Sequence, residues 1–148
     1  MIMIMNPQPW MKIARSKLGE HEIPGPRANE FIVECLESTT IGAPDNESDE
    51  TPWCSAFVNW CVSQTGMQGT NSAWARSWLE WGQEAKSEDE WPGCICVLER
   101  GPNSGHVGFL EDWDSDGQRV KLLAGNQGDA VSEAWFPMSR VLGYRVPA

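Results

Sequence analysis

The sequence predicts an α+β fold in which helices come first and an antiparallel sheet follows. Two observations support this order. Up to Gly82, apolar residues recur at helical spacing between residues that favour helix ends, whereas the second half contains short apolar runs separated by turns. The length of 148 residues, 41% of them hydrophobic, suits one compact domain over residues 1–148.

Two helices are expected near the N-terminus. The first is expected over residues 8–18, because Trp10 and Ile13 fall on one face and Gly19 occupies the position of a helix C-cap. The second is expected over residues 29–38, where the apolar side chains again share one face.

A third helix follows an acidic loop. Thr51 is a good N-cap residue, and Pro52 after it is tolerated at the first helical position. This helix is expected to run to about Gln64. A short further helix, capped by Ser72, is expected to end near Gly82.

The second half reads as strands. Short apolar runs alternate with turn residues, and a turn over residues 114–117 joins two of them into a hairpin. The expected strands cover residues 94–98, 106–110, 119–124 and 141–146.

Charge and hydropathy narrow the function. The formal net charge of −10 argues against nucleic-acid binding, which needs a basic face. No apolar run is long enough to span a membrane, so membrane insertion is not expected. The segment Met1 to Met5 is too short for a signal-peptide core. Synthesis in the cytoplasm without a signal peptide is therefore expected.

One of the five cysteines is placed for nucleophilic chemistry. Cys54 lies in the first turn of the third predicted helix, where exposed N–H groups and the helix dipole favour a thiolate. The odd number of cysteines and the absence of a C-x-x-C pair argue against a disulfide framework and a structural zinc site. Buried packing roles are expected for the others: Cys35, Cys61, Cys94 and Cys96.

A catalytic thiol needs a base, and the chain has two histidines. His106 opens an apolar strand after a glycine and is the candidate, although a structural histidine would fit the same pattern; His21 is expected at the surface. A third polar group must orient the imidazole. Asn126, at the end of the strand expected to pair with that of His106, is the candidate, and Gln127 is the alternative. A simple turn role for Asn126 also fits its Gly-rich setting.

Several segments together resemble a known family, the CHAP and NlpC-type peptidoglycan hydrolases, and in particular a phage- and bacterium-encoded CHAP-like subgroup. The likeness covers nearly the whole chain. Its segments are the nucleophile helix at residues 51–61, the next helix at 72–78, the histidine strand at 105–109, the strand end at 125–128, and the flanks at 10–26 and 141–147.

The resemblance implies a papain-like fold, with the catalytic cysteine at the N-terminus of a helix that packs on an antiparallel sheet. It implies a cysteine peptidase or amidase that cuts an amide bond of the wall peptide through a thioester, using Cys54, His106 and Asn126. Many CHAP enzymes carry an acidic residue two positions before that asparagine. Here Ala124 occupies the position, so the acid is absent.

The expected partner is the peptidoglycan stem peptide, reached in the cell wall or periplasm after delivery or release. Such a protein would act as a phage lysin or as an antibacterial effector, the latter with delivery machinery and an immunity protein as partners. A cell-wall-binding module with a degenerate site is the alternative. A redox or metal protein built on the cysteines is a further one, which the absence of standard ligand spacing argues against.

The acidic loop before Cys54 offers two further interpretations. Alternating oxygen ligands at Asp45, Glu47 and Asp49 suit Ca²⁺, although the spacing is not that of an EF-hand and acidic loops are usually solvated. Carboxylates here also suit the free amine of a stem peptide. No cofactor other than calcium is expected. The candidate substrate-binding residues are Trp53, Asp49, Glu50 and Gln127.

Overall fold

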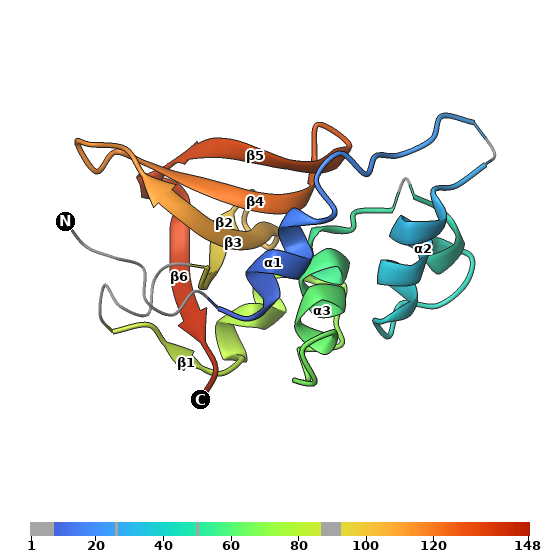
Figure 1. Ribbon diagram of the computed structural model, residues 1–148, viewed down its shortest axis with the longest axis horizontal. Coiled ribbons are helices and arrows are strands. Elements are labelled where there is room, and N and C mark those ends of the chain that lie inside the picture. Colours follow the sequence, from blue (N-terminus) through green and yellow to red (C-terminus); the bar gives the residue numbers. More distant parts are fainter. Residues whose placement is uncertain (1–7, 26, 50, 87–92) are drawn as a thin grey trace.

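The computed structural model describes residues 8–25, 27–49, 51–86 and 93–148. Figure 1 shows helices gathered on one side of a twisted sheet, with α2 farthest from the strands. The helices are α1 (Trp10–Arg15), α2 (Glu30–Glu37) and α3 (Cys54–Ser63), with 3₁₀ turns at Asp45–Glu47 (η1), Ala75–Glu80 (η2) and Met138–Arg140 (η3).

The strands of the described residues form one antiparallel sheet in the order β1-β6-β2-β3-β4-β5. They are β1 (Gln83–Glu84), β2 (Ile95–Glu99), β3 (Gly105–Trp113), β4 (Arg119–Gln127), β5 (Ala130–Pro137) and β6 (Val141–Val146). The predicted α+β fold, with the cysteine-bearing helix against an antiparallel sheet, is confirmed. In the described part of the chain, no helix has the length and apolar character needed to cross a membrane.

The first two helices are shorter than the sequence suggests. At the end of α1 the hydrogen bonds change early from the α-helical to the 3₁₀ pattern, because the N–H of Lys17 donates to the Ala14 carbonyl, three residues back. The turn then ends at Gly19, whose φ of 96° is a backbone conformation that glycine adopts readily and other residues rarely do. α2 begins after Asn29, whose side chain accepts hydrogen bonds from the first helical N–H groups at 2.8 and 3.3 Å.

The third helix starts later than expected. The prediction that Thr51 caps it is wrong, because the Thr51 hydroxyl donates to the Asp45 carbonyl at 2.8 Å and so ties down the acidic loop. Trp53 occupies the capping position without a side-chain cap. Cys54 is therefore the first residue of α3 rather than its third.

A glycine lets α3 approach the sheet closely. A Cβ placed on Gly125 of β4 would lie 2.5 Å from a ring carbon of Trp53 and 3.0 Å from Cβ of Phe57. No side chain larger than hydrogen fits in this contact. The N-terminus of α3 is thereby held against the end of β4, opposite the start of β3.

The sheet is buried on both faces along its central strands. On the helix side, Val107 and Phe109 join the core built with α1, α2 and α3. On the other side a second cluster forms around Leu98, Leu110 and Leu122, with Tyr144 packed against it. The four cysteines expected to have packing roles are all 0% exposed, which confirms their burial: Cys35, Cys61, Cys94 and Cys96.

Strand β5 was not expected from the sequence. It is an edge strand whose side chains, apart from Val131, are half-buried or exposed, so it lacks the apolar run that marks the central strands. A two-residue turn connects it to β4, and both Gly128 and Asp129 have positive φ, at 62° and 60°. Positive φ at both central positions is the geometry of a type I′ hairpin, which Gly128 adopts without steric cost and which an aspartate such as Asp129 tolerates.

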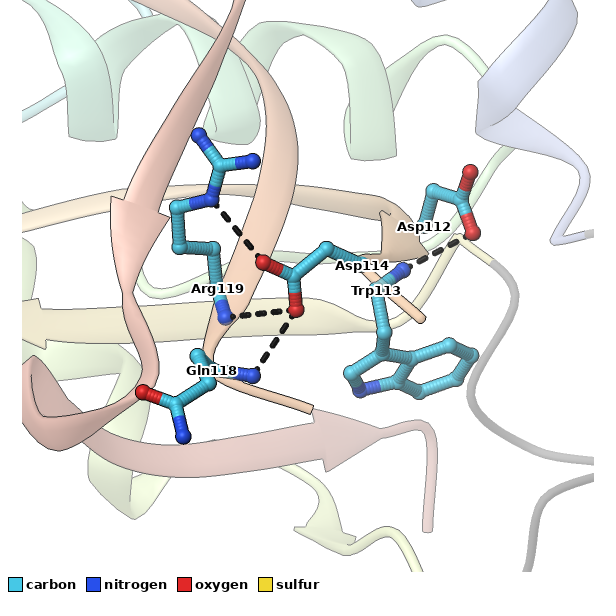
Figure 2. A network of polar contacts seen from close by, with 5 residues as sticks. All are labelled: Asp112, Trp113, Asp114, Gln118 and Arg119. Atoms are coloured by element: carbon cyan, nitrogen blue, oxygen red, sulfur yellow. Dashed lines mark hydrogen bonds and ion pairs between the residues drawn. The ribbon is translucent and has the colours of Figure 1, made fainter. Parts of the chain in front are cut away.

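The expected turn between β3 and β4 is present, and Figure 2 shows how it is held. The Asp114 carboxylate accepts hydrogen bonds from the backbone N–H groups of Gln118 and Arg119, at 2.8 and 3.0 Å, and from Arg119 Nε at 2.9 Å. The bond from the Arg119 side chain is the main reason that the pKa of Asp114 is lowered to about 2. The β3–β4 hairpin is therefore closed by a turn that includes a charge-assisted hydrogen bond between Arg119 and Asp114.

Candidate active site

The start of α3 meets the start of β3. Cys54 is the first residue of α3 and His106 is the second residue of β3; they are 4% and 5% exposed. Their side chains share a hydrogen bond. The structure thus brings together the thiol and the imidazole that the sequence pairs from 52 residues apart.

The far side of the imidazole is held by Gln127. His106 Nε2 lies 2.8 Å from Gln127 Oε1. The Gln127 amide nitrogen donates to the carbonyls of Ser132, at 2.8 Å, and Leu122, at 3.3 Å. Since those carbonyls only accept, the amide oxygen must face the ring, and Nε2 of His106 must carry the hydrogen. Nδ1 is then the nitrogen left for the thiol of Cys54.

Asn126, the predicted orienting residue, does not contact His106 in this way. Within the described residues its side chain has no hydrogen bond to the imidazole, and its backbone is left-handed, with φ of 61°. A bulge between Ala124 and Gln127 shifts the register of β4 against β5 and turns the Gln127 side chain inward. The alternative, Gln127, is the residue that holds the ring. Gln127 also lines the cavity beside the imidazole, and its substrate contact stays a prediction from the sequence.

The pKa of the Cys54 thiol lies below its ordinary value of 9.0. Burial alone would raise it, since burial penalises the thiolate. The hydrogen bond and the charge of His106 outweigh this, aided by backbone N–H groups of Val107 and Ser55 that point at the sulfur. The site therefore stabilises a thiolate.

The pKa of His106 moves in the opposite direction, above its ordinary value of 6.5. Burial would lower it, and the nearby charge of Arg100 adds to that effect. The hydrogen bond and charge of Cys54 prevail, and the hydrogen bond to Gln127 helps. The lowered pKa of Cys54 and the raised pKa of His106 both favour a thiolate beside an imidazolium, and the two titrations are coupled.

These shifts predict selective alkylation at mildly acidic pH. At about pH 6.5 an ordinary thiol is less than about 1% thiolate and reacts slowly. Iodoacetamide should nevertheless modify Cys54, because the pKa of its thiol is lowered. Cys35, Cys61 and Cys96 should resist, since burial raises the pKa of all three, for Cys96 to about 12. Peptide mapping after brief treatment checks this, and equal labelling of Cys54 and Cys61 would contradict it.

Trp53 was expected at the substrate cleft, and this prediction is wrong. The side chain is 0% exposed and packs against Gly125. Its indole N–H donates to a carboxylate oxygen of Glu22 at 2.9 Å. Trp53 therefore positions the start of α3 and offers no face to a ligand. A large aromatic residue beside a nucleophile fits either role in sequence, and packing decides between them.

Asp49 was expected to bind substrate or calcium, but it holds the backbone of a neighbouring loop. It is 2% exposed, and its Oδ2 accepts from the N–H groups of Ile23 and Asn29, both at 2.8 Å. The substrate-binding prediction for Asp49 is thus wrong. Glu50 lies outside the described residues.

The other calcium candidates, Asp45 and Glu47, are exposed on the acidic loop. Among the described residues, no three histidine, cysteine, aspartate or glutamate side chains gather as a metal site would require. Calcium binding stays a prediction from the sequence.

Asp49→Ala should lower the stability of the fold. Two backbone N–H groups, of Ile23 and Asn29, would lose their acceptor, and each buried unpaired donor costs roughly 1–3 kcal/mol. We expect the free energy of unfolding in urea to fall by about 2 kcal/mol or more. The matched control is Asp45→Ala in the same loop, where the side chain is exposed and the expected change is within about 0.5 kcal/mol.

A cavity of about 460 Å³ opens beside the imidazole, on the side of Gln127. Its walls include Asn126, Ser132 and Phe136, and two arginines, Arg100 and Arg140. Asn126 thus belongs to the site as a wall residue. The sequence gives no sign that the two arginines belong there, because they follow different strands and meet only in the folded sheet.

Comparison with known proteins agrees with this geometry. The family model described as the CHAP domain matches residues 46–126, more than half of the chain. The match includes Cys54 and His106 and ends one residue before Gln127. A search of curated proteins finds no match. The chain therefore belongs to the CHAP domain family, whose members are generally hydrolases that act on peptidoglycan.

Proposed function

We propose that this protein hydrolyses an amide bond of the peptidoglycan stem peptide, with Cys54 as nucleophile, His106 as acid and base, and Gln127 as the residue that positions His106. The observation that carries the proposal is the hydrogen-bonded series of these three side chains at the start of α3, in a chain of the CHAP family. The proposed setting is the wall, reached by a lysin or by a delivered antibacterial effector.

The first half of the reaction uses the ion pair. The Cys54 thiolate attacks the scissile carbonyl and forms a tetrahedral intermediate. The backbone N–H of Cys54 supports the oxyanion, because the first N–H groups of a helix have no partner within the helix. Nδ1 of His106 then gives its proton to the leaving amine, the C–N bond breaks, and a thioester remains on Cys54.

The second half restores the enzyme. Neutral His106 takes a proton from water, and the resulting hydroxide attacks the thioester carbonyl. The C–S bond breaks, the carboxylic acid leaves, and the thiolate and imidazolium are re-formed. Gln127 keeps the hydrogen on Nε2 throughout, so Nδ1 remains the nitrogen that exchanges protons.

Digestion of purified peptidoglycan sacculi tests the proposal. Wild-type protein in reductant should release soluble fragments, and their masses identify the bond that is cut. The same protein after alkylation at about pH 6.5 should release none, and circular dichroism checks that the alkylated protein keeps its secondary structure. Binding to sacculi without release of fragments would instead support a wall-binding module.

The role of Gln127 predicts a change in pH dependence. Gln127→Ala should slow turnover roughly 10- to 100-fold, the range seen when an orienting partner is lost. Because the bond from Gln127 raises the pKa of His106, its loss should move the alkaline limb of activity to lower pH. Asn126→Gly keeps the left-handed backbone, and because the Asn126 side chain has no hydrogen bond to the imidazole among the described residues, the pH at which either limb falls should not move. An unchanged pH profile in Gln127→Ala would contradict the positioning role.

A further inference from the structure

The cavity beside His106 is basic, although the chain as a whole carries a net charge of −10. Its lining includes Arg100, Arg140 and His106, and among the described residues no acidic side chain joins them. A second hollow, of about 600 Å³, shares the same two arginines and also includes the exposed residue Glu99. The two arginines therefore line both hollows, and in the cavity that includes the imidazole the charge of the described walls is opposite to that of the whole molecule.

Arg140 is held in place from two directions. Its Nε donates to the Glu99 carbonyl at 3.0 Å, and its guanidinium carbon lies 5.3 Å from the centre of the Phe136 ring. Within the described residues, its two terminal nitrogens have no protein acceptor and no carboxylate partner. A guanidinium fixed at one nitrogen and open at the others is prepared for an external anion.

The Arg100 side chain has no comparable contact among the described residues. It is exposed, and the described part of the chain offers its side chain neither a hydrogen bond nor an ion pair. Its guanidinium is nevertheless near enough to His106 to act on the ionisation of that ring. Two guanidinium groups whose terminal nitrogens have no acceptor among the described residues thus line one cavity, on the side of the imidazole where Nε2 meets Gln127.

The position of the cavity decides which part of a substrate it can hold. Cys54 is not among its walls; the cavity lies beyond His106, on the Gln127 side. In the proposed reaction the acyl carbon bonds Cys54 and the leaving nitrogen faces Nδ1 of His106, so the amine-side residue is the part of the substrate that extends past the imidazole toward Gln127 and the cavity. A ligand group in this cavity therefore belongs to the fragment that leaves first.

We propose that Arg100 and Arg140 bind a free carboxylate on the amine side of the scissile bond. The substrate is then a wall peptide whose released fragment carries a carboxylate near the new amino group, and a peptide with a carboxamide there is a poor substrate. This inference rests on the proposed function. Arginine forks bind carboxylates through paired charge-assisted hydrogen bonds, which a neutral carboxamide cannot match.

Paired substrates provide the test. Two synthetic stem peptides, identical except for a carboxylate or a carboxamide on the amine side, are hydrolysed by wild type and by Arg100→Gln. Wild type should prefer the carboxylate, and Arg100→Gln should lose roughly 10- to 100-fold in kcat/KM on the carboxylate peptide alone. Arg119→Gln, a surface arginine in the β3–β4 turn, is the matched control and should leave that preference unchanged.

A binding measurement separates this inference from the reaction itself. Cys54→Ala protein should bind the carboxylate peptide more tightly than the carboxamide peptide, and the added replacement Arg100→Gln should remove the difference. Equal binding and equal hydrolysis of the two peptides would overturn the subsite but leave the proposed function intact. Preferential binding without any Cys54-dependent hydrolysis would overturn the proposed function but leave the subsite intact.

Discussion

Replacement of Cys54 by alanine is expected to reduce fragment release from sacculi by at least about 10⁴-fold, near the limit of detection. This corresponds to roughly 5 kcal/mol or more of lost transition-state stabilisation. The reason is that the proposed reaction has no other group to form the thioester: the remaining cysteines lie in apolar packing, and none shares a hydrogen bond with His106. Quantitative mass spectrometry of the released fragments measures the loss.

The matched control is Cys61→Ala, seven residues along the same helix. Cys61 is 0% exposed and burial raises its pKa, so its loss should lower stability without lowering the catalytic rate. Circular dichroism should show that both variants keep the secondary structure. Wild-type turnover in Cys54→Ala would overturn the assignment of the nucleophile. Loss of turnover in Cys61→Ala with an intact fold would place a second functional thiol in α3.

The pairing of Cys54 with His106 was predictable because their positions have a simple physical meaning. A cysteine at the start of a helix meets unpaired N–H groups, and this holds whether it is the first or the third residue of that helix. A histidine at the start of an apolar strand must lie at the edge of the sheet where that strand begins. The structure places both at these points, in Cys54 and His106, and pairs their side chains.

The orienting residue was not predictable to a single position. Asn126 and Gln127 are neighbours, and along a regular strand neighbouring side chains point to opposite faces. Which of them faces His106 depends on the bulge after Ala124 and on the tight turn at Gly128 and Asp129. Those features reflect pairing with β5, an edge strand that has little apolar pattern of its own.

The predictions of Trp53 and Asp49 as substrate contacts were wrong for a different reason. Sequence proximity to Cys54 suggested both residues as contacts. Instead, Trp53 packs against Gly125, and Asp49 accepts hydrogen bonds from the N–H groups of Ile23 and Asn29. The walls beside His106 come instead from distant segments, including Arg100 and Arg140, 40 residues apart. Charge patterns along a sequence do not reveal which side chains converge after folding.

His106→Ala is expected to reduce hydrolysis by roughly 10³- to 10⁴-fold, close to the effect of removing the nucleophile, because the two residues act as a unit. The variant loses the acid for the leaving amine and the base for water. It also loses the largest influence that lowers the pKa of Cys54, so burial should then dominate and the thiol pKa should rise. Alkylation of Cys54 at about pH 6.5 should slow together with hydrolysis.

The control for this change is His21→Ala, which should retain wild-type hydrolysis, since His21 is exposed and its Nδ1 lies 2.9 Å from the backbone carbonyl oxygen of Glu22. Unchanged hydrolysis in His106→Ala would overturn the mechanism. Rapid alkylation without hydrolysis in that variant would mean that the N–H groups of Ser55 and Val107 suffice to hold the thiolate. His106 would then serve proton transfer alone, so the two measurements together separate how the site makes its nucleophile from how it releases its product.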